Sequence, residues 1–179
     1  MFIMRLLFLL LLLVPHKAKL IAQDQRTDNA SVQHELGLQY LAQNEFESAL
    51  VTLEEAITRA EQQKDEVAKA SIQLSLARLH YTVHNFDRAA LEALNALEAL
   101  RQKDQAELIA QGQTLLGFIY TENGKWEEAD IFLHLADQYY SMENATQKRA
   151  KVLLGYGALA IKQKEFGQAI NYLQAWYQG

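Results

Sequence analysis

The sequence predicts an all-α solenoid of four antiparallel helix pairs. Four aromatic residues stand 40 positions apart in the 179-residue chain, at Phe46, Phe86, Trp126 and Phe166. Small residues recur with the same period, at Gly37, Ala77, Gly117 and Gly157 and at Ala49, Ala89, Ala129 and Ala169. Fixed-period repetition is typical of proteins that stack one small unit. One proline and eight glycines in the whole chain favour helix almost throughout.

Residues 1–22 are expected to be a leader and not part of the fold. Arg5 gives a short positive region, residues 6–14 are an unbroken apolar run, and Ala22 offers a small residue for cleavage. This is the layout of a secretory signal peptide, and the run is shorter than the roughly 20 apolar residues of a bilayer span. We expect an exported protein, periplasmic or extracellular. An uncleaved membrane anchor at residues 2–14 and a misassigned start remain as alternatives.

Composition narrows the classes of function. The formal net charge is −5, and it becomes −8 without the three cations of the expected leader. A surface this acidic disfavours nucleic acid and anionic lipid as partners. The chain has no cysteine, which excludes disulfides, thiolate metal sites and a cysteine nucleophile.

Residues 23–179 are expected to form one repeat domain. Its repeats are 24–63, 64–103, 104–143 and 144–179. In the second repeat, apolar residues recur at three- and four-residue steps from Val67 to Tyr81, which predicts an amphipathic helix. A second stripe begins at Phe86, and Asp65 and Asp104 are expected to cap the first helices of the second and third repeats.

Each pair of helices is separated by a short break. Asn44, His84, Gly124 and Lys164 occupy the same position of this break in the four repeats. Gly and Asn tolerate the left-handed conformation that ends a helix, whereas Lys is the least natural choice. Because so short a break makes the helices antiparallel, we expect the small residues to lie where they cross and the aromatic column to pack between them. The repeat-packing set is Gly37, Phe46, Ala49, Ala77, Phe86, Ala89, Gly117, Trp126, Ala129, Gly157, Phe166 and Ala169.

These positions resemble a tetratricopeptide repeat. The first repeat shows it in Leu36 to Tyr40 and Phe46 to Ala49, and the third in Leu116 to Tyr120 and Trp126 to Ala129. The usual period is about 34 residues, so these repeats resemble the longer variety found in bacterial regulators and sensors. The resemblance implies a right-handed superhelix that acts as a non-catalytic scaffold or adaptor for a protein or peptide, with no cofactor.

In tetratricopeptide arrays the first helices line a concave groove that binds peptides. By this resemblance the groove-facing residues are His34, Leu38, Leu41, Leu74, Arg78, Tyr81, Gln111, Thr114, Phe118, Thr121, Lys151, Leu154 and Ile161. Arginine and aromatic residues often dominate such recognition. A second expectation concerns the basic fourth repeat, where the cluster Lys148, Arg149, Lys151, Lys162 and Lys164 is a candidate for an acidic ligand. A solvated helix face is the alternative.

Catalytic and metal sites find little support. His80 and His84 could share a helix face, but one falls in a packing column and the other in a turn. The adjacent carboxylates Glu54-Glu55 and Glu127-Glu128 do not face one another on a helix. We therefore expect no enzyme and no metal. The sequons at Asn29 and Asn144 coincide with expected helix caps, and capping is the preferred role.

The last helix raises two further alternatives. It stops a few residues short of its counterparts, with the fourth repeat incomplete, and we expect Tyr172, Leu173, Trp176 and Tyr177 to face solvent. Such a patch indicates either a fragment of a longer protein or an interface. The chain could accordingly be the extracytoplasmic sensor segment of a membrane signalling protein such as a histidine kinase. It could also be a self-assembly module that associates through the Trp176 end.

Overall fold

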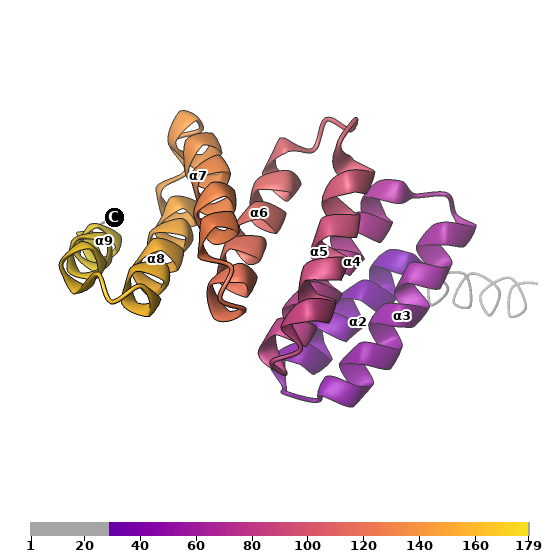
Figure 1. The fold of residues 1–179 in the computed structure, drawn as a ribbon. Coiled ribbons are helices and arrows are strands. Elements are labelled where there is room, and N and C mark those ends of the chain that lie inside the picture. The colour runs from indigo at the N-terminus through magenta and orange to yellow at the C-terminus, as the bar shows by residue number, and fades with distance from the viewer. Residues whose placement is uncertain (1–28, 179) are drawn as a thin grey trace, which may run out of the picture. The chain divides into compact units, whose positions relative to one another are not determined.

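The computed structural model describes residues 29–178 (Figure 1). The expected leader, residues 1–22, and the start of the first repeat lie outside the described residues. The chain divides into two compact units, residues 1–63 and 64–179. In its described part the first unit contains helices α2 (Ala30–Ala42) and α3 (Phe46–Gln62). The second contains α4 (Glu66–Thr82), α5 (Phe86–Leu100), α6 (Ala106–Glu122), α7 (Trp126–Met142), α8 (Thr146–Lys162) and α9 (Phe166–Gln178).

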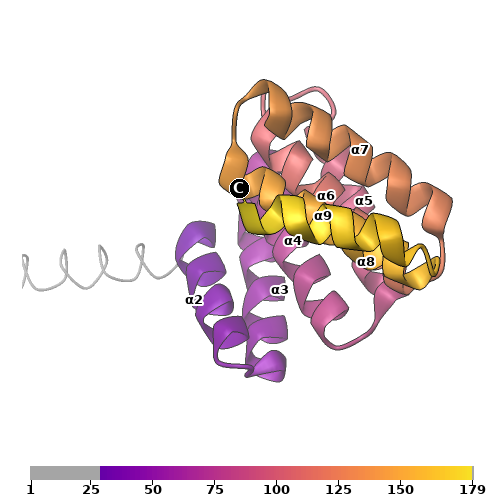
Figure 2. The same cartoon turned by 90° about the vertical axis from the view of Figure 1, so that its left-hand side faces the viewer.

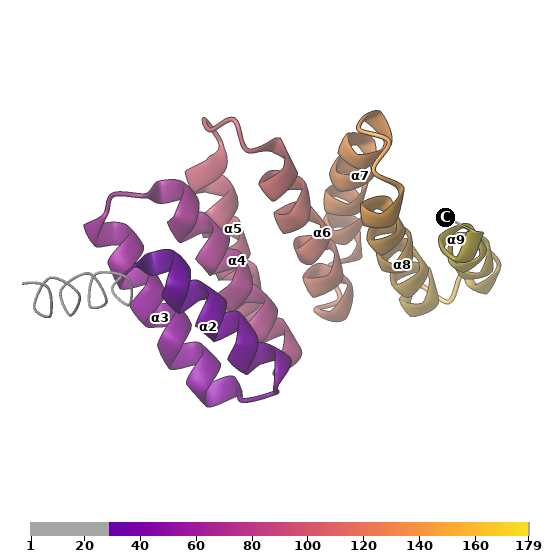
Figure 3. The same cartoon turned by 180° about the vertical axis from the view of Figure 1, so that it is seen from behind.

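The predicted all-α solenoid is confirmed. Consecutive helices pair as α2 with α3, α4 with α5, α6 with α7, and α8 with α9. In the second unit α9 lies against α8 at the end (Figure 2), and the pairs follow one another in chain order (Figure 3). From Phe46 to Phe166 a new helix begins every 20 residues. None of the helices within residues 29–178 has the length and apolar character needed to cross a bilayer.

The breaks within the pairs end in left-handed residues, as the sequence predicts. The backbone φ is 61° at Asn44, 59° at His84, 75° at Gly124 and 64° at Lys164. In each case the next N–H donates to a carbonyl five residues back, as from Asn85 to His80 at 2.8 Å and from Glu165 to Ala160 at 2.8 Å. This bond belongs to the Schellman motif, which satisfies the last carbonyls of a helix. The motif forms even with lysine in the strained position.

One connection departs from this pattern. Between α5 and α6 the link spans residues 101–105 and contains no residue with positive φ. Its turn is held instead by the Lys103 N–H donating to the Leu100 carbonyl at 2.9 Å. The N-cap of α6 is Gln105, whose side chain makes no capping bond. The expectation that Asp104 caps α6 is therefore wrong: α6 begins in register with α4, and the counterpart of the Asp65 cap is Gln105, one residue after Asp104.

Of the other three predicted caps, two are confirmed and one is wrong. The Asp65 carboxylate accepts the Ala68 N–H at 2.9 Å, and the Asn29 side chain accepts the Ser31 N–H at 3.2 Å. Both caps are confirmed. Asn144 does not cap α8, since it adopts φ 52° and the N-cap position belongs to Ala145. Asn144 is therefore a turn residue, a role in which asparagine tolerates the left-handed conformation.

The small residues lie where the paired helices cross. A Cβ placed on Gly37 would lie 2.6 Å from Leu53 Cδ2, and one on Gly117 would lie 2.5 Å from Leu133 Cδ2. Gly157 meets Leu173 in the same way, at 3.0 Å. The second repeat has alanine in both positions, Ala77 and Ala93, and both are buried. Each crossing thus holds either glycine with leucine or two alanines, which keeps the packed volume similar.

The aromatic column is not equivalent from repeat to repeat. Phe86 is half-buried and packs against the rings of Tyr81 and His84, with centroids 5.8 and 5.7 Å away. Phe46 is also half-buried, but Trp126 is 37% and Phe166 61% exposed. The expectation of a packed aromatic is therefore wrong for Phe166 and weak for Trp126. Their repeats have Thr121 and Ile161 in the position of Tyr81, and among the described residues neither makes a ring contact like that of Phe86.

The end of α9 is less exposed than the sequence suggests. Tyr172 stacks on Tyr156 with centroids 5.0 Å apart, and Leu173 packs into the space at Gly157. Both are half-buried, so the expectation of four solvent-facing residues is wrong for these two. Trp176 and Tyr177 are 41% and 84% exposed.

Candidate functional site

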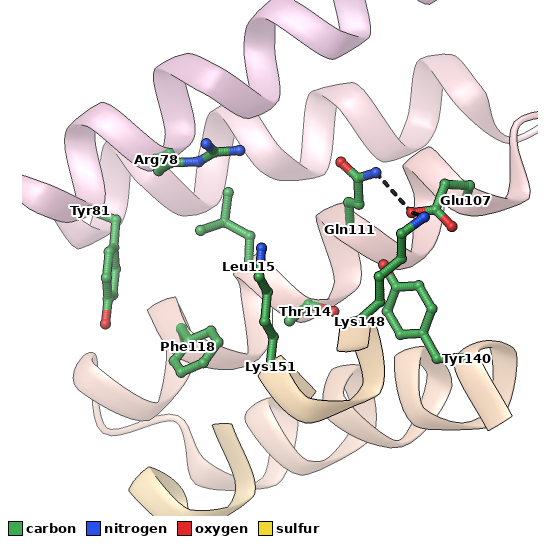
Figure 4. A pocket seen from close by; sticks show the side chains of 10 residues that line it. All are labelled: Arg78, Tyr81, Glu107, Gln111, Thr114, Leu115, Phe118, Tyr140, Lys148 and Lys151. Carbon is green, nitrogen blue, oxygen red and sulfur yellow. Dashed lines mark hydrogen bonds and ion pairs between the residues drawn. The ribbon is translucent and has the colours of Figure 1, made fainter. Parts of the chain in front are cut away.

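A hollow of about 440 Å³ opens among the first helices of the second unit (Figure 4). Side chains from α4, α6 and α8 form most of it, and α7 contributes one. The lining residues are Arg78, Tyr81, Glu107, Gln111, Thr114, Leu115, Phe118, Tyr140, Lys148 and Lys151. We call this hollow the groove. Because it crosses three repeats, an occupant would contact three successive helix pairs.

One end of the groove is occupied by an internal polar network. Lys148 Nζ on α8 lies 2.8 Å from Glu107 Oε1 on α6, and Gln111 Nε2 donates to the same oxygen at 2.9 Å. Burial opposes ionisation of Glu107, but the hydrogen bonds from Lys148 and Gln111 outweigh it and hold its pKa below the usual value. The ionised carboxylate therefore neutralises Lys148.

The base of the groove is neutral. Tyr140 is only 3% exposed, and burial, reinforced by the charge of Glu107, raises its pKa to about 12. Thr114 is buried and its hydroxyl donates to the Ala110 carbonyl at 2.8 Å. Leu115 and Phe118 are half-buried and add apolar surface. This part of the groove offers packing area and no charge.

The opposite side carries two uncompensated cations. Arg78 and Lys151 are both exposed, and neither has an ion-pair partner among residues 29–178. Arg78 enters from α4 and Lys151 from α8, with Leu115 of α6 between them (Figure 4). Tyr81 lies on the same helix as Arg78 and lines the same hollow; burial raises its pKa, so its hydroxyl stays protonated.

The basic cluster predicted for the fourth repeat does not act as one patch. Lys148 is paired with Glu107, Arg149 Nε lies 2.7 Å from Asp137 Oδ1, and Lys162 Nζ lies 2.7 Å from Glu122 Oε2. Lys164 lies in the turn before α9, away from the groove lining. Of the five predicted cations, only Lys151 faces the groove without a partner in the described part of the chain. The acidic third repeat neutralises three of the others.

The structure places the groove residues expected from the sequence as follows. Six of them line the groove: Arg78, Tyr81, Gln111, Thr114, Phe118 and Lys151. Leu74 and Thr121 are buried instead, and the Thr121 hydroxyl donates to the Gly117 carbonyl at 2.8 Å. Leu154 is half-buried, and Ile161 is 48% exposed outside the lining. His34, Leu38 and Leu41 are half-buried on α2, in the other unit. A binding role for the set stays a prediction.

Four lining residues are absent from the predicted groove set, although one of them, Lys148, belongs to the predicted basic cluster. Glu107 and Lys148 stand in the first turns of their helices, and only their opposite charges in adjacent repeats could have paired them. Leu115 is the bulky counterpart of Gly155 one repeat later, a difference visible in the sequence. Tyr140 belongs to a second helix, so a rule restricted to first helices cannot find it.

The residues considered as metal ligands or as acid/base pairs have other surroundings in the structure. In residues 29–178 no three His, Cys, Asp or Glu side chains gather as metal ligands. His84 instead packs edge-on against Phe86. The paired carboxylates Glu54-Glu55 and Glu127-Glu128 are all exposed.

Comparisons with known proteins support the fold. No protein-family model matches the chain, and no curated protein matches its sequence. Among solved structures it is similar to BtubC (BKLC) from P. vanneervenii, with 17% identity and a TM-score of 0.70 over 83% of this chain. The match spans 62% of the BtubC chain, so this chain corresponds to only part of that protein.

A second similar structure comes from Podosopora anserina. It is described as a kinesin light chain with nearly identical TPR-like repeats, and the match has 17% identity and a TM-score of 0.64 over 83% of this chain and 74% of that one. A point variant of the same protein matches with 16% identity and a TM-score of 0.69 over 89% of this chain and 80% of that one. Likeness at this identity shows the fold alone: the chain is a TPR-like repeat solenoid.

Proposed function

We propose that this protein is a non-catalytic scaffold whose groove binds an extended segment of another protein. The observation that carries the proposal is the groove itself, which joins α4, α6 and α8 and combines apolar packing surface with two cations, Arg78 and Lys151, that have no ion-pair partner among residues 29–178. A peptide of a few residues could lie across three repeats there. TPR-like folds generally serve as protein-interaction scaffolds, which supports the same reading. Export to the periplasm or the cell exterior is part of the proposal and rests on the leader alone.

Binding to a peptide array tests the proposal. The full chain is applied to an array of random 12-residue peptides, and the best binders are titrated by fluorescence anisotropy. Gln111→Trp places an indole in the groove from an exposed position, and Asn95→Trp makes the same change at an exposed position of α5 outside it. We expect the first variant to lose at least tenfold in affinity and the second to keep it. Equal affinity of both variants for every binder would contradict the proposal.

An exposed apolar face along α9 favours a second candidate function, self-association. Phe166, Ile170 and Tyr177 are 61%, 56% and 84% exposed and recur at helical spacing on one face. In α5 the equivalent positions Phe86 and Ala90 are covered, with Ala90 only 8% exposed. Exposed apolar stripes of this kind mark interfaces. Light scattering as a function of concentration should show association that Ile170→Glu abolishes; a monomer at all concentrations would exclude this candidate.

A further inference from the structure

We propose that the groove selects an acidic segment and holds one of its carboxylates between Arg78 and Lys151. This inference rests on the proposed function and specifies the chemistry of the ligand. It differs from the sequence-based expectation, which placed an acidic ligand on the fourth repeat alone. The structure moves the site to two residues 73 positions apart in the chain, on α4 and α8.

The ion pairs around the groove leave two of its cations without a partner among residues 29–178. Three carboxylates of the third repeat, Glu107, Glu122 and Asp137, each hold one cation of the fourth repeat at 2.7–2.8 Å. Arg78 and Lys151 are left out of this pairing among the described residues. The chain as a whole carries a net charge of −5, so a groove with two uncompensated cations differs in sign from the rest. Opposite local charge of this kind attracts an anionic partner and repels a cationic one.

The geometry favours a carboxylate as the anion. The Arg78 guanidinium presents a planar fork of donors that fits a carboxylate in two parallel hydrogen bonds. Lys151 adds a point charge from the other wall, and Leu115 separates the two at the base (Figure 4). Tyr81 and Phe118 provide apolar surface next to this position. The stem of an aspartate or glutamate side chain can pack there while its carboxylate reaches the cations.

Glu107 sets where the acidic residue can lie. Its ionised carboxylate stands at the end of the groove near Lys148 and Tyr140. A second ligand carboxylate at that end would meet a like charge and a cation that is already paired. The ligand is therefore acidic at one end and neutral at the other. Removing the Glu107 charge would release Lys148 and widen the acidic zone.

A peptide titration tests the inference. The probes are three fluorescein-labelled 12-residue peptides of the same sequence with two glutamates, two glutamines or two lysines at one end. The full chain is titrated with each peptide by fluorescence anisotropy, first at low salt and then at about 0.5 M NaCl. At the higher concentration the Debye length is about 4 Å, so interactions between exposed charges further apart than this are largely screened. At low salt we expect the glutamate peptide to bind at least about tenfold more tightly than the glutamine peptide. At high salt this preference should vanish.

Two charge-reversal variants make the test specific. Arg78→Glu with Lys151→Glu should invert the preference, so that the lysine peptide binds best. Arg88→Glu with Lys103→Glu changes the net charge equally at exposed residues outside the groove and should leave the preference unchanged. Glu107→Gln should strengthen binding of a peptide with glutamates at both ends by several-fold. Circular dichroism of each variant confirms that the helices persist.

The outcomes separate the two proposals. If all three peptides bind equally and the groove reversal changes nothing, the inferred acid selectivity is wrong, although the scaffold function stands when Gln111→Trp still weakens binding. If both reversals shift the preference alike, the effect is one of net charge and the Arg78–Lys151 site is wrong. If no peptide binds at any salt concentration and the array yields no binder, the proposed function itself fails.

Discussion

Two junctions between repeats, α5 with α6 and α7 with α8, differ in which helix supplies the large side chain that fills the contact. At the α7/α8 junction the second helix supplies the large residue, Leu133, and the first helix supplies Gly155, whose added Cβ would lie 2.5 Å from Leu133 Cδ2. One repeat earlier the corresponding positions are Ala93 and Leu115. The large residue has moved to the first helix. The helices keep the same spacing along the chain at both junctions, but the large side chain comes from a different helix.

This exchange shapes the groove. Leu115 stands on a groove-lining helix and forms part of the base of the groove, whereas Gly155, in the same place one repeat later, is not among the lining residues. A compensating exchange occurs nearby, because Leu97 packs at Gly112 with 2.7 Å to an added Cβ, and the later repeat has Asp137 and Val152 in those positions. The α5/α6 junction is thus wholly apolar at this level, whereas the α7/α8 junction carries the Arg149–Asp137 ion pair. A repeat protein can vary its groove by exchanging a large and a small residue between the two helices that pack at a junction.

Leu133→Ala should have the largest effect on stability. Leu133 is fully buried between Gly117 and Gly155, so its removal leaves a cavity that two glycines cannot fill. We expect a loss of about 2–5 kcal/mol in the free energy of unfolding, measured by urea denaturation. The double variant Gly117→Ala with Leu133→Ala copies the Ala77 and Ala93 crossing and should recover part of this loss. A double variant less stable than the single one would contradict the volume exchange.

Gly155→Ala should destabilise the α7/α8 junction by about 1–3 kcal/mol, because the new methyl group overlaps Leu133. Gly167→Ala is the matched control, since an added Cβ there meets nothing within 4 Å. Thermal unfolding by circular dichroism compares the two. Equal melting temperatures would show that α8 can shift without cost.

The α7/α8 junction should also respond to alkaline pH. Tyr140 occupies the position that Leu100 fills at the α5/α6 junction, and its folded pKa of about 12 exceeds the value of about 10 for an unfolded tyrosine. The neutral phenol is thus favoured by folding, and its contribution is complete below pH 10 and is lost as the pH rises toward 12. Tyr140→Phe should flatten the fall in unfolding free energy over this range. An unchanged slope would mean that other tyrosines govern it.

Asp137→Asn should have the smallest effect. The ion pair with Arg149 has two contacts, of 2.7 and 3.3 Å, but the two side chains are 24% and 45% exposed. Partly exposed pairs contribute roughly 0–1 kcal/mol and weaken with salt. We expect the free energy of unfolding to fall by less than about 1 kcal/mol at low salt. The loss should be smaller still in about 0.5 M NaCl, because salt at this concentration screens surface charges. A larger, salt-independent loss would indicate that Asp137 holds the junction together by itself.

The sequence was sufficient for the fold because the repeat period records backbone requirements directly. The left-handed turns at Asn44 and Gly124 favour residues that tolerate positive φ, and the close crossings at Gly37 and Gly117 need a small residue at a fixed position. The repeat period predicted burial wrongly where the neighbouring side chains decide it. Phe166 has the residue type of the aromatic column but lacks the ring partners that cover Phe86.

The groove was predictable only in part, for a related reason. Helix periodicity places Arg78, Phe118 and Lys151 on the first helices, but it does not reveal which charges are already satisfied. Lys148 and Lys151 lie three residues apart and look alike in the sequence. Only the position of Glu107 in the preceding repeat distinguishes the paired lysine from the unpaired one.

Mapping of a bound peptide by nuclear magnetic resonance tests the central claim most directly. Amide resonances of the full chain are followed while the tightest array binder is added. If the peptide binds in the groove, the shifted resonances should concentrate on the groove-facing residues of α4, α6 and α8, with Arg78, Leu115 and Lys151 among them. Shifts confined to the exposed face of α9, or to the outer surfaces of α5 and α7, would contradict it.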